Sequence, residues 1–142
     1  MIVRARSAIA KNGITVSTQF ADGLVPVQGD RVQLQQVVMN LILNAVEAMS
    51  SDEKAIRELS IRTKQYPADR GVLVEVRDSG PGIDRGNLER VFEPFYTTKT
   101  SGVGMGLSIC RSIINAHGGR LWAEANEPGG AVFQFTLPGT ER

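Results

Sequence analysis

The segment QLQQVVMNLILNAVEAM, residues 33–49, combines a long apolar surface with one narrow polar stripe. At about 100° per residue on a helix, the stripe occupies an arc of about 80°, whereas almost every other position is apolar. The stripe residues are Gln33, Gln36, Asn40, Asn44 and Glu47. Asp30 lies just before the segment and is a favoured helix N-cap, so we expect a long helix from Asp30 to about Met49.

The two asparagines of the stripe, Asn40 and Asn44, admit two interpretations. A stripe facing solvent normally favours lysine, glutamate and arginine, and asparagine is only a moderate helix former, so helix stability does not explain them. In the first interpretation, the amides form a polar seam that hydrogen-bonds a neighbouring element. In the second, their carbonyl oxygens face a hydrated hard cation such as Mg²⁺, which takes few protein ligands and keeps water and phosphate ligands.

Periodicity and turn residues place further elements on both sides of this helix. A short helix is expected over residues 2–11, and another helix over residues 107–116. The expected strands are residues 14–20, 24–28, 59–64, 72–77, 120–125 and 131–137, the last two forming a hairpin. Residues 78–106 are rich in glycine and show little periodicity, which indicates a functional or mobile segment.

Asp78 lies at the end of an apolar row. Val72, Val74 and Val76 share one face of the expected strand, and Asp78 has the same parity. A buried carboxylate costs free energy unless other groups donate hydrogen bonds to it. The turn Ser79-Gly80-Pro81-Gly82 follows at once, and a glycine backbone can approach a flat ligand closely. Asp78 therefore either caps its own turn or accepts a hydrogen bond from an exocyclic amine such as that of adenine.

A second glycine cluster, residues 101–107, leads directly into the helix expected up to residue 116. Its alternating glycines leave backbone N–H groups available for phosphate oxygens, helped by the helix dipole, although a flexible loop explains the cluster equally well. It is neither a dinucleotide-binding fingerprint nor a P-loop, since no strand runs into it and no Gly-Lys-Ser/Thr follows. Upstream, the aromatic residues of 92–96 could pin a lid to the core and leave Lys99 to meet a phosphate.

Composition excludes several functional classes. The chain has 142 residues, 42% of them hydrophobic and 22% charged, as in one soluble globular domain. Its net charge of +1 provides no strong field for nucleic acid or an anionic membrane. A single cysteine, Cys110, excludes an internal disulfide, and a single histidine, His117, excludes a two-histidine metal site. No apolar run approaches the roughly 20 residues that cross a bilayer.

Four short segments, in this order, resemble the motifs of the catalytic ATP-binding domain of bacterial sensor histidine kinases. They are Asn40–Ala48 (N box), Asp78–Ile83 (G1 box), Phe92–Phe95 (F box) and Gly102–Leu107 (G2 box). Each motif alone is weak evidence for the family, but four motifs in this order are specific for it. The residues of the motifs are most similar to those of oxygen- and nitrogen-responsive kinases of the rhizobial type. This family has the Bergerat fold, shared with type II topoisomerases, ninety-kilodalton heat-shock chaperones and mismatch-repair ATPases.

The resemblance implies a two-layer α/β (α+β) sandwich, with helices on one face of a five-stranded, mixed and largely antiparallel sheet. It implies that Asn44 ligates Mg²⁺, that Asn40 assists near the phosphates, and that Asp78 accepts from the adenine amino group. Residues 85–103 would form a mobile lid over ATP. The residues expected to contact the nucleotide are Asn40, Asn44, Glu47, Asp78, Gly80, Gly82, Ile83, Phe95, Thr98, Lys99, Gly102, Val103, Gly104, Met105, Gly106 and Leu107, with Asn40, Asn44 and Lys99 taking part in catalysis.

One departure separates this chain from some relatives of the fold. The topoisomerase and chaperone branch has a glutamate base four residues before the magnesium asparagine, where this chain has Asn40, an amide that cannot accept a proton from water. Glu47 is less suited to that role. Transfer of the γ-phosphoryl group to a histidine is therefore expected rather than rapid hydrolysis, since an imidazole needs no strong base. A serine kinase of the anti-sigma type and an ATP-gated clamp are the alternatives.

The acceptor histidine is expected on a separate dimerisation segment. His117 directly follows a helix and is expected to favour the helix dipole, Cys110 to be a small core residue, and Trp122 to pack in the last hairpin. The expected partners are the kinase's own dimerisation and histidine-phosphotransfer domain and a response regulator, with no nucleic acid and no membrane insertion. We expect residues 1–142 to form one domain, monomeric and cytoplasmic (or the cytosolic part of a membrane-anchored kinase), with residues 1–12 as the junction to the dimerisation domain.

Overall fold

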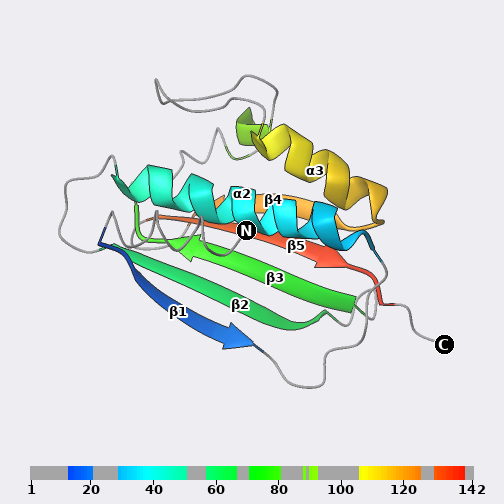
Figure 1. Cartoon of the computed structure of the whole chain (residues 1–142), viewed down its shortest axis with the longest axis horizontal. Helices are drawn as coiled ribbons and strands as arrows, with labels where there is room; N and C mark the ends of the chain where they lie inside the picture. Colours follow the sequence, from blue (N-terminus) through cyan, green and yellow to red (C-terminus); the bar gives the residue numbers. More distant parts are fainter. Residues whose placement is uncertain are drawn as a thin grey trace.

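A computed structural model of the chain describes residues 13–20, 29–50, 57–66, 71–80, 88, 90–92, 106–125 and 130–139 (Figure 1). The expected helix over residues 2–11, the expected strand over residues 24–28 and nearly all of the expected lid over residues 85–103 lie outside these described residues.

The strands form one five-stranded sheet in the order β1-β2-β3-β5-β4 (Figure 1). Strand β1 runs parallel to β2, and the other three neighbouring pairs are antiparallel. The strands are β1 (Thr15–Phe20), β2 (Glu58–Tyr66), β3 (Gly71–Asp78), β4 (Arg120–Ala125) and β5 (Ala131–Leu137). The predicted mixed and largely antiparallel sheet is therefore confirmed, and β4 and β5 form the predicted hairpin.

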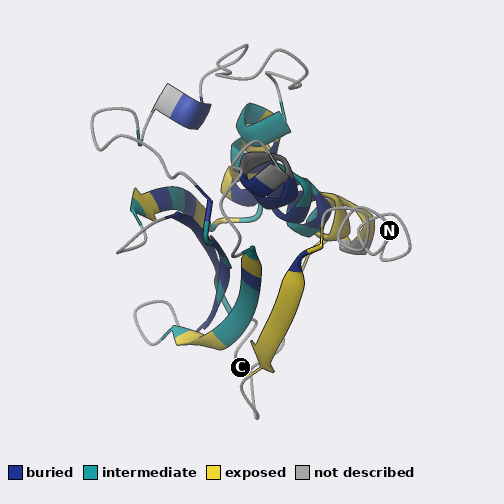
Figure 2. Cartoon of the chain, turned by 90° about the vertical axis from the view of Figure 1, so that its left-hand side faces the viewer, coloured by how far each residue is buried: buried dark blue, intermediate teal, exposed yellow. Residues whose placement is uncertain are grey.

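Helices α2 (Arg31–Ser50) and α3 (Gly106–Ala116) lie over the same face of this sheet, which curves around them (Figures 1 and 2). Both agree with the helices predicted from the sequence. A single 3₁₀ turn, η3 (Arg90–Phe92), lies within the stretch predicted to be irregular. One turn is too short to produce a visible hydrophobic period, so sequence patterning could not reveal it.

The core fills the space between the helices and the concave face of the sheet (Figure 2). Leu41 of α2, Ile114 of α3 and Phe133 and Phe135 of β5 are among its most buried side chains. Helix α2 buries a broad apolar arc that includes Val37, Leu41 and Met49, whereas Gln33 and Gln36 of the polar stripe are exposed. The ring of Phe92 meets that of Phe133 edge to face at 6.0 Å, which attaches η3 to the sheet.

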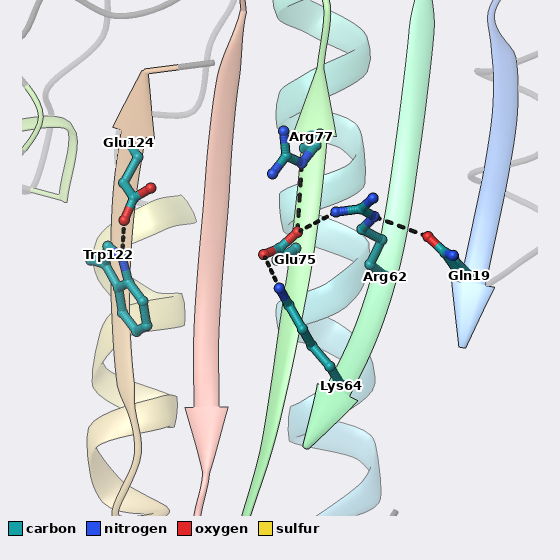
Figure 3. A network of polar contacts seen from close by, with 7 residues as sticks. All are labelled: Gln19, Arg62, Lys64, Glu75, Arg77, Trp122 and Glu124. Carbon is teal, nitrogen blue, oxygen red and sulfur yellow. Dashed lines mark hydrogen bonds and ion pairs between the residues drawn. The ribbon is translucent and has the colours of Figure 1, made fainter. Parts of the chain in front are cut away.

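The other face of the sheet carries a row of polar side chains around one buried carboxylate (Figure 3). The side chain of Glu75 on β3 is only 5% exposed and lies 3.5–3.8 Å from the cationic groups of Arg62, Lys64 and Arg77. On β4 of the same face, Trp122 donates its indole N–H to a Glu124 carboxylate oxygen at 2.9 Å. Trp122 therefore packs on this open face and not in the core beneath the helices.

Candidate functional site

Asp78 is the last residue of β3, and its side chain is buried as the parity of that strand predicts. Its Oδ1 accepts one hydrogen bond from the backbone N–H of Gly80 at 2.9 Å and another from that of Ala131 at 3.3 Å. The carboxylate thus caps its own turn, as one interpretation predicts, and is also held by the sheet. Two fixed donors on one oxygen orient the whole carboxylate, which a base-recognition site requires.

Gly130 holds the backbone of Asp78 from the other side. It has a φ of +106°, and a Cβ added to it would lie 1.9 Å from the carbonyl oxygen of Asp78. Only glycine permits both the left-handed backbone and this close approach. Gly130 lies in the turn between the two strands of the predicted hairpin, but its contact with Asp78 could not be predicted, because the two residues are far apart in the sequence.

Ser79 connects the Asp78 turn to helix α2. Its hydroxyl accepts a hydrogen bond from the backbone N–H of Glu58 at 2.9 Å and contacts the sulfur of Met49 at 3.6 Å. The end of α2 therefore lies beside the turn that follows β3. Asn44 is five residues before Met49 on the same helix, about 7.5 Å along its axis, and its side chain is half-buried.

Two contacts determine how α3 lies along α2. At the beginning of α2, the N–H of Asp30 donates to Nε2 of His117, which follows α3, at 3.0 Å. The second contact is a hydrogen bond from the thiol of Cys110 to the carbonyl oxygen of Val37, at 3.9 Å. Val37 is seven residues after Asp30, whereas Cys110 is seven residues before His117. The two helices therefore run antiparallel, as Figure 1 shows.

This register brings the start of α3 to the polar stripe of α2. Continuing four residues from Cys110 places Gly106, the first residue of α3, level with the part of α2 between Asn40 and Asn44. The N-terminal N–H groups of α3, where the second glycine cluster ends, thus lie level with the part of α2 that carries both amides. A helix N-terminus and amide oxygens together suit an anionic ligand that carries a hard cation.

Asn40 bonds to α3 through Cys110. Burial raises the pKa of the Cys110 thiol from its ordinary value of 9.0 to about 11, and a hydrogen bond from the Asn40 side chain acts in the opposite direction. The thiol is fully buried, which confirms the predicted core role of Cys110. This contact supports the polar-seam interpretation for Asn40, whereas the role of Asn40 near the phosphates and Mg²⁺ ligation by Asn44 stay predictions.

Six of the predicted nucleotide contacts lie among the described residues, on α2, at the end of β3 and at the start of α3. They are Asn40, Asn44, Asp78, Gly80, Gly106 and Leu107. Nine others lie outside the described residues: Gly82, Ile83, Phe95, Thr98, Lys99, Gly102, Val103, Gly104 and Met105. Glu47 lies on α2, but its side chain is also outside the description.

Among the described residues, no group of three or more histidine, cysteine, aspartate or glutamate side chains could hold a metal ion. Within the same part of the chain, no helix is both long and apolar enough to cross a membrane.

The sequence matches the family model described as histidine kinase-, DNA gyrase B- and HSP90-like ATPase over residues 29–141. This chain belongs to that family of ATP-binding domains. Its fold matches that of the catalytic domain of the histidine kinase ThkA in a nucleotide-free form, with a TM-score of 0.80, 38% identity, and coverage of 96% of this chain and 86% of that one.

Among curated proteins, the chain is similar to sensor protein FixL of Bradyrhizobium diazoefficiens, with 51% identity over 115 residues. It is also similar to sensor histidine kinase TmoS of Ectopseudomonas mendocina, with 38% identity over 138 residues. These alignments include 81% and 97% of this chain but only 22% and 14% of the two relatives. The chain therefore corresponds to a part of these relatives, and the predicted resemblance to sensor histidine kinase catalytic domains is confirmed.

Proposed function

We propose that this chain binds Mg²⁺-ATP and transfers the γ-phosphoryl group to a histidine on a separate dimerisation segment. The observation that carries the proposal is the buried carboxylate of Asp78, held by two backbone N–H groups beside the C-terminal half of α2. The antiparallel register of the helices puts the start of α3 level with the middle of α2, between Asn40 and Asn44. The relatives ThkA, FixL and TmoS are sensor proteins or histidine kinases by name, which supports this function class.

Asp78 would select the base. A carboxylate accepts hydrogen bonds and cannot donate them when ionised, so it pairs with the 6-amino group of adenine and not with the 6-carbonyl oxygen of guanine. The N–H groups of Gly80 and Ala131 both bond to one oxygen of Asp78 and prevent the carboxylate from rotating. Gly80 itself is buried, so its backbone forms part of the wall beside this acceptor.

The donor set near the phosphates suits Mg²⁺ without a protein cage. Asn44 offers an amide oxygen on a half-buried part of α2, and the remaining ligands of a hydrated hard cation would be phosphate oxygens and water. When bound, the ion neutralises phosphate charge during transfer. The chain's own contribution is to hold the amide of Asn44 and the N–H groups at the start of α3 in one place.

Asn40 favours transfer over hydrolysis. Its amide cannot accept a proton from a water molecule, and it hydrogen-bonds Cys110 on α3. A histidine acceptor needs only to be positioned, because a neutral imidazole nitrogen is already nucleophilic. ATP bound with Mg²⁺ beside Asn40 would therefore stay intact until the acceptor histidine is positioned, instead of being hydrolysed rapidly.

The proposed partners are a dimerisation and phosphotransfer segment carrying the acceptor histidine, and a response regulator downstream of it. ThkA has been solved in complex with the response regulator TrrA, at a TM-score of 0.79 and 35% identity to this chain, which supports the second partner. Since the proposed substrate is ATP, the domain would act in the cytoplasm.

Phosphorylation of a supplied acceptor tests this function. The chain is incubated with Mg²⁺ and γ-labelled ATP, with and without a dimerisation segment from a sensor histidine kinase similar to this chain. We expect label on the segment that is lost in acid and stable in base, as a phosphoramidate is. An acid-stable phosphoserine would instead indicate the anti-sigma type of kinase, and steady hydrolysis without transfer would indicate an ATP-gated clamp; either result overturns the proposal.

A further inference from the structure

The imidazole of His117 connects the beginning of α2 to the end of α3. Its Nε2 accepts the N–H of Asp30 at 3.0 Å, and its Nδ1 lies 2.8 Å from the carbonyl oxygen of Ile113. Asp30 is the N-cap of α2, since its Oδ1 accepts the backbone N–H of Gln33 at 3.0 Å. One side chain therefore joins the N-terminal end of α2 to the C-terminal end of α3, at the end of the pair opposite to the Asp78 turn.

The chemistry of these contacts determines the state of the ring. A backbone N–H can only donate and a carbonyl oxygen can only accept. Nε2 must therefore present its lone pair to Asp30, and Nδ1 must carry the proton donated to Ile113. Only the neutral tautomer protonated at Nδ1 satisfies both partners. His117 thus supports the C-terminal carbonyls of α3, as predicted from the sequence, but it does so as a neutral donor.

Packing holds the ring in this position. A Cβ on Gly29 would lie 2.6 Å from Cδ2 and 3.0 Å from Nε2 of His117, so the ring lies directly against the backbone before α2. On the other side, Gly118 has a φ of +82°, and the N–H groups of Gly118 and Gly119 bond to carbonyls in the last turn of α3 at 3.0 Å. This glycine-based cap fixes the backbone that carries the ring.

We propose that His117 is a positioning residue for the nucleotide site, because it sets the register of α3 against α2. The inference rests on the proposed function, in which Asn44 and the start of α3 hold the phosphates. Among the described residues, hydrogen bonds between the backbone of α2, including its N-cap, and the side chains of His117 and Cys110 hold the two helices together. Without the first contact, α3 can pivot about Cys110, which changes the position of Gly106 relative to Asn44.

The ring state is tested without nucleotide. Long-range ¹⁵N–¹H NMR spectra of the chain should show His117 as the neutral tautomer protonated at Nδ1. Gly29→Ala introduces a Cβ into the space of the ring and should shift the His117 signals while leaving its side chain chemically unchanged. A ring protonated at Nε2 in the native chain would overturn the proposal.

The positioning role is tested by Mg²⁺-ATP binding under conditions in which every variant is fully folded. His117→Leu removes both hydrogen bonds and should raise the Kd by about tenfold. His117→Gln, whose carboxamide oxygen can accept the Asp30 N–H, should recover much of the affinity. Ile114→Val is the control, because it shortens a buried side chain of the same helix and leaves the His117 contacts in place.

A double-variant cycle with Asn44→Ala separates positioning from general loosening. If His117 acts through the alignment at Asn44, His117→Leu should weaken binding much less when Asn44 is already alanine. Equal effects in both backgrounds, or equal Kd values for His117→Leu and Ile114→Val, would overturn the positioning role and leave the proposed function intact. Absence of Mg²⁺-ATP binding by the native chain would overturn both.

Discussion

The backbone N–H of Ala131, the first residue of β5, donates a 3.3 Å hydrogen bond to Oδ1 of Asp78, the last residue of β3. The two residues are 53 positions apart in the sequence. The proposed base-recognition carboxylate is therefore positioned by the C-terminal hairpin as well as by the turn that contains Gly80. Any change that moves the start of β5 is expected to affect nucleotide selection.

Replacing Asp78 with asparagine should remove the preference for adenine. In Asp78→Asn one oxygen can still accept the N–H groups of Gly80 and Ala131, but the other position becomes an NH₂ group, which cannot accept from the adenine amine. We expect the affinity for Mg²⁺-ATP to fall by about 10- to 100-fold and the ratio of ATP to GTP affinity to fall with it. Titration calorimetry with both nucleotides measures this, and an unchanged ratio would contradict the role of Asp78.

Replacing Asn44 should affect nucleotide binding only when Mg²⁺ is present. In Asn44→Ala the amide oxygen proposed as a metal ligand is lost, so the Kd for Mg²⁺-ATP should rise by about tenfold. With EDTA present, the Kd for ATP should match that of the native chain. Gln36→Ala is the matched control, because Gln36 belongs to the same stripe but is exposed two turns earlier. Equal losses with and without Mg²⁺ would place Asn44 outside the metal site.

The local parts of the fold and site could be predicted from the sequence. Apolar periodicity revealed α2 and α3, and the parity of Val72, Val74 and Val76 predicted that the Asp78 side chain is buried. These features depend on spacing within one element, which the sequence displays directly. The four motifs then indicated the family.

The contacts between distant elements could not be predicted in the same way. Two examples are the contact of Gly130 with Asp78 and that of His117 with Asp30. In each, the two residues come close only when the sheet and the helix pair are complete. The burial of Glu75 was also hidden, because its parity on β3 places it on the face away from the helices, where polar residues are normal. Only the register across the sheet shows that three cationic side chains surround it.

The contact at Gly130 predicts a large difference between two glycine substitutions. In Gly130→Ala the new Cβ would meet the Asp78 carbonyl oxygen in addition to the strain of a positive φ, so unfolding free energy should fall by more than about 3 kcal/mol. Gly13→Ala is the control: its φ is +63°, yet no atom lies within 4 Å of the added Cβ. Urea unfolding should therefore show a loss of only about 1–2 kcal/mol for Gly13→Ala. Equal losses would mean that the approach to Asp78 costs nothing.

The polar row on the open face predicts that two glutamate substitutions differ in their effect on stability. Glu75→Gln removes the carboxylate that three cations surround, and we expect a loss of about 1–2 kcal/mol, moderated because those cations reach solvent. Glu124→Gln makes the same change on the same face at an exposed side chain and should cost less than about 1 kcal/mol. Urea unfolding of both variants at low salt measures the difference. A Glu75→Gln variant as stable as Glu124→Gln would show that the row contributes little.

The thiol of Cys110 predicts how stability depends on alkaline pH. Burial in the folded chain raises its pKa from 9.0 to about 11, so the folded state holds the thiol proton more tightly than the unfolded state does. This contribution is complete below about pH 9 and is lost as the pH rises towards 11. Over that interval the unfolding free energy should fall by about 2–3 kcal/mol on account of this one group.

Other groups also titrate in this range, so the measured quantity is the difference between the native chain and Cys110→Ala. Urea unfolding at pH 8, 9, 10 and 11 should show the native chain losing more stability than the variant, because the alanine has no proton to lose. The same burial should keep the native thiol unreactive towards a thiol reagent at pH 8 until urea unfolds the chain. Parallel pH profiles for the two proteins, or rapid labelling of the folded chain, would show that Cys110 is not sealed between α2 and α3.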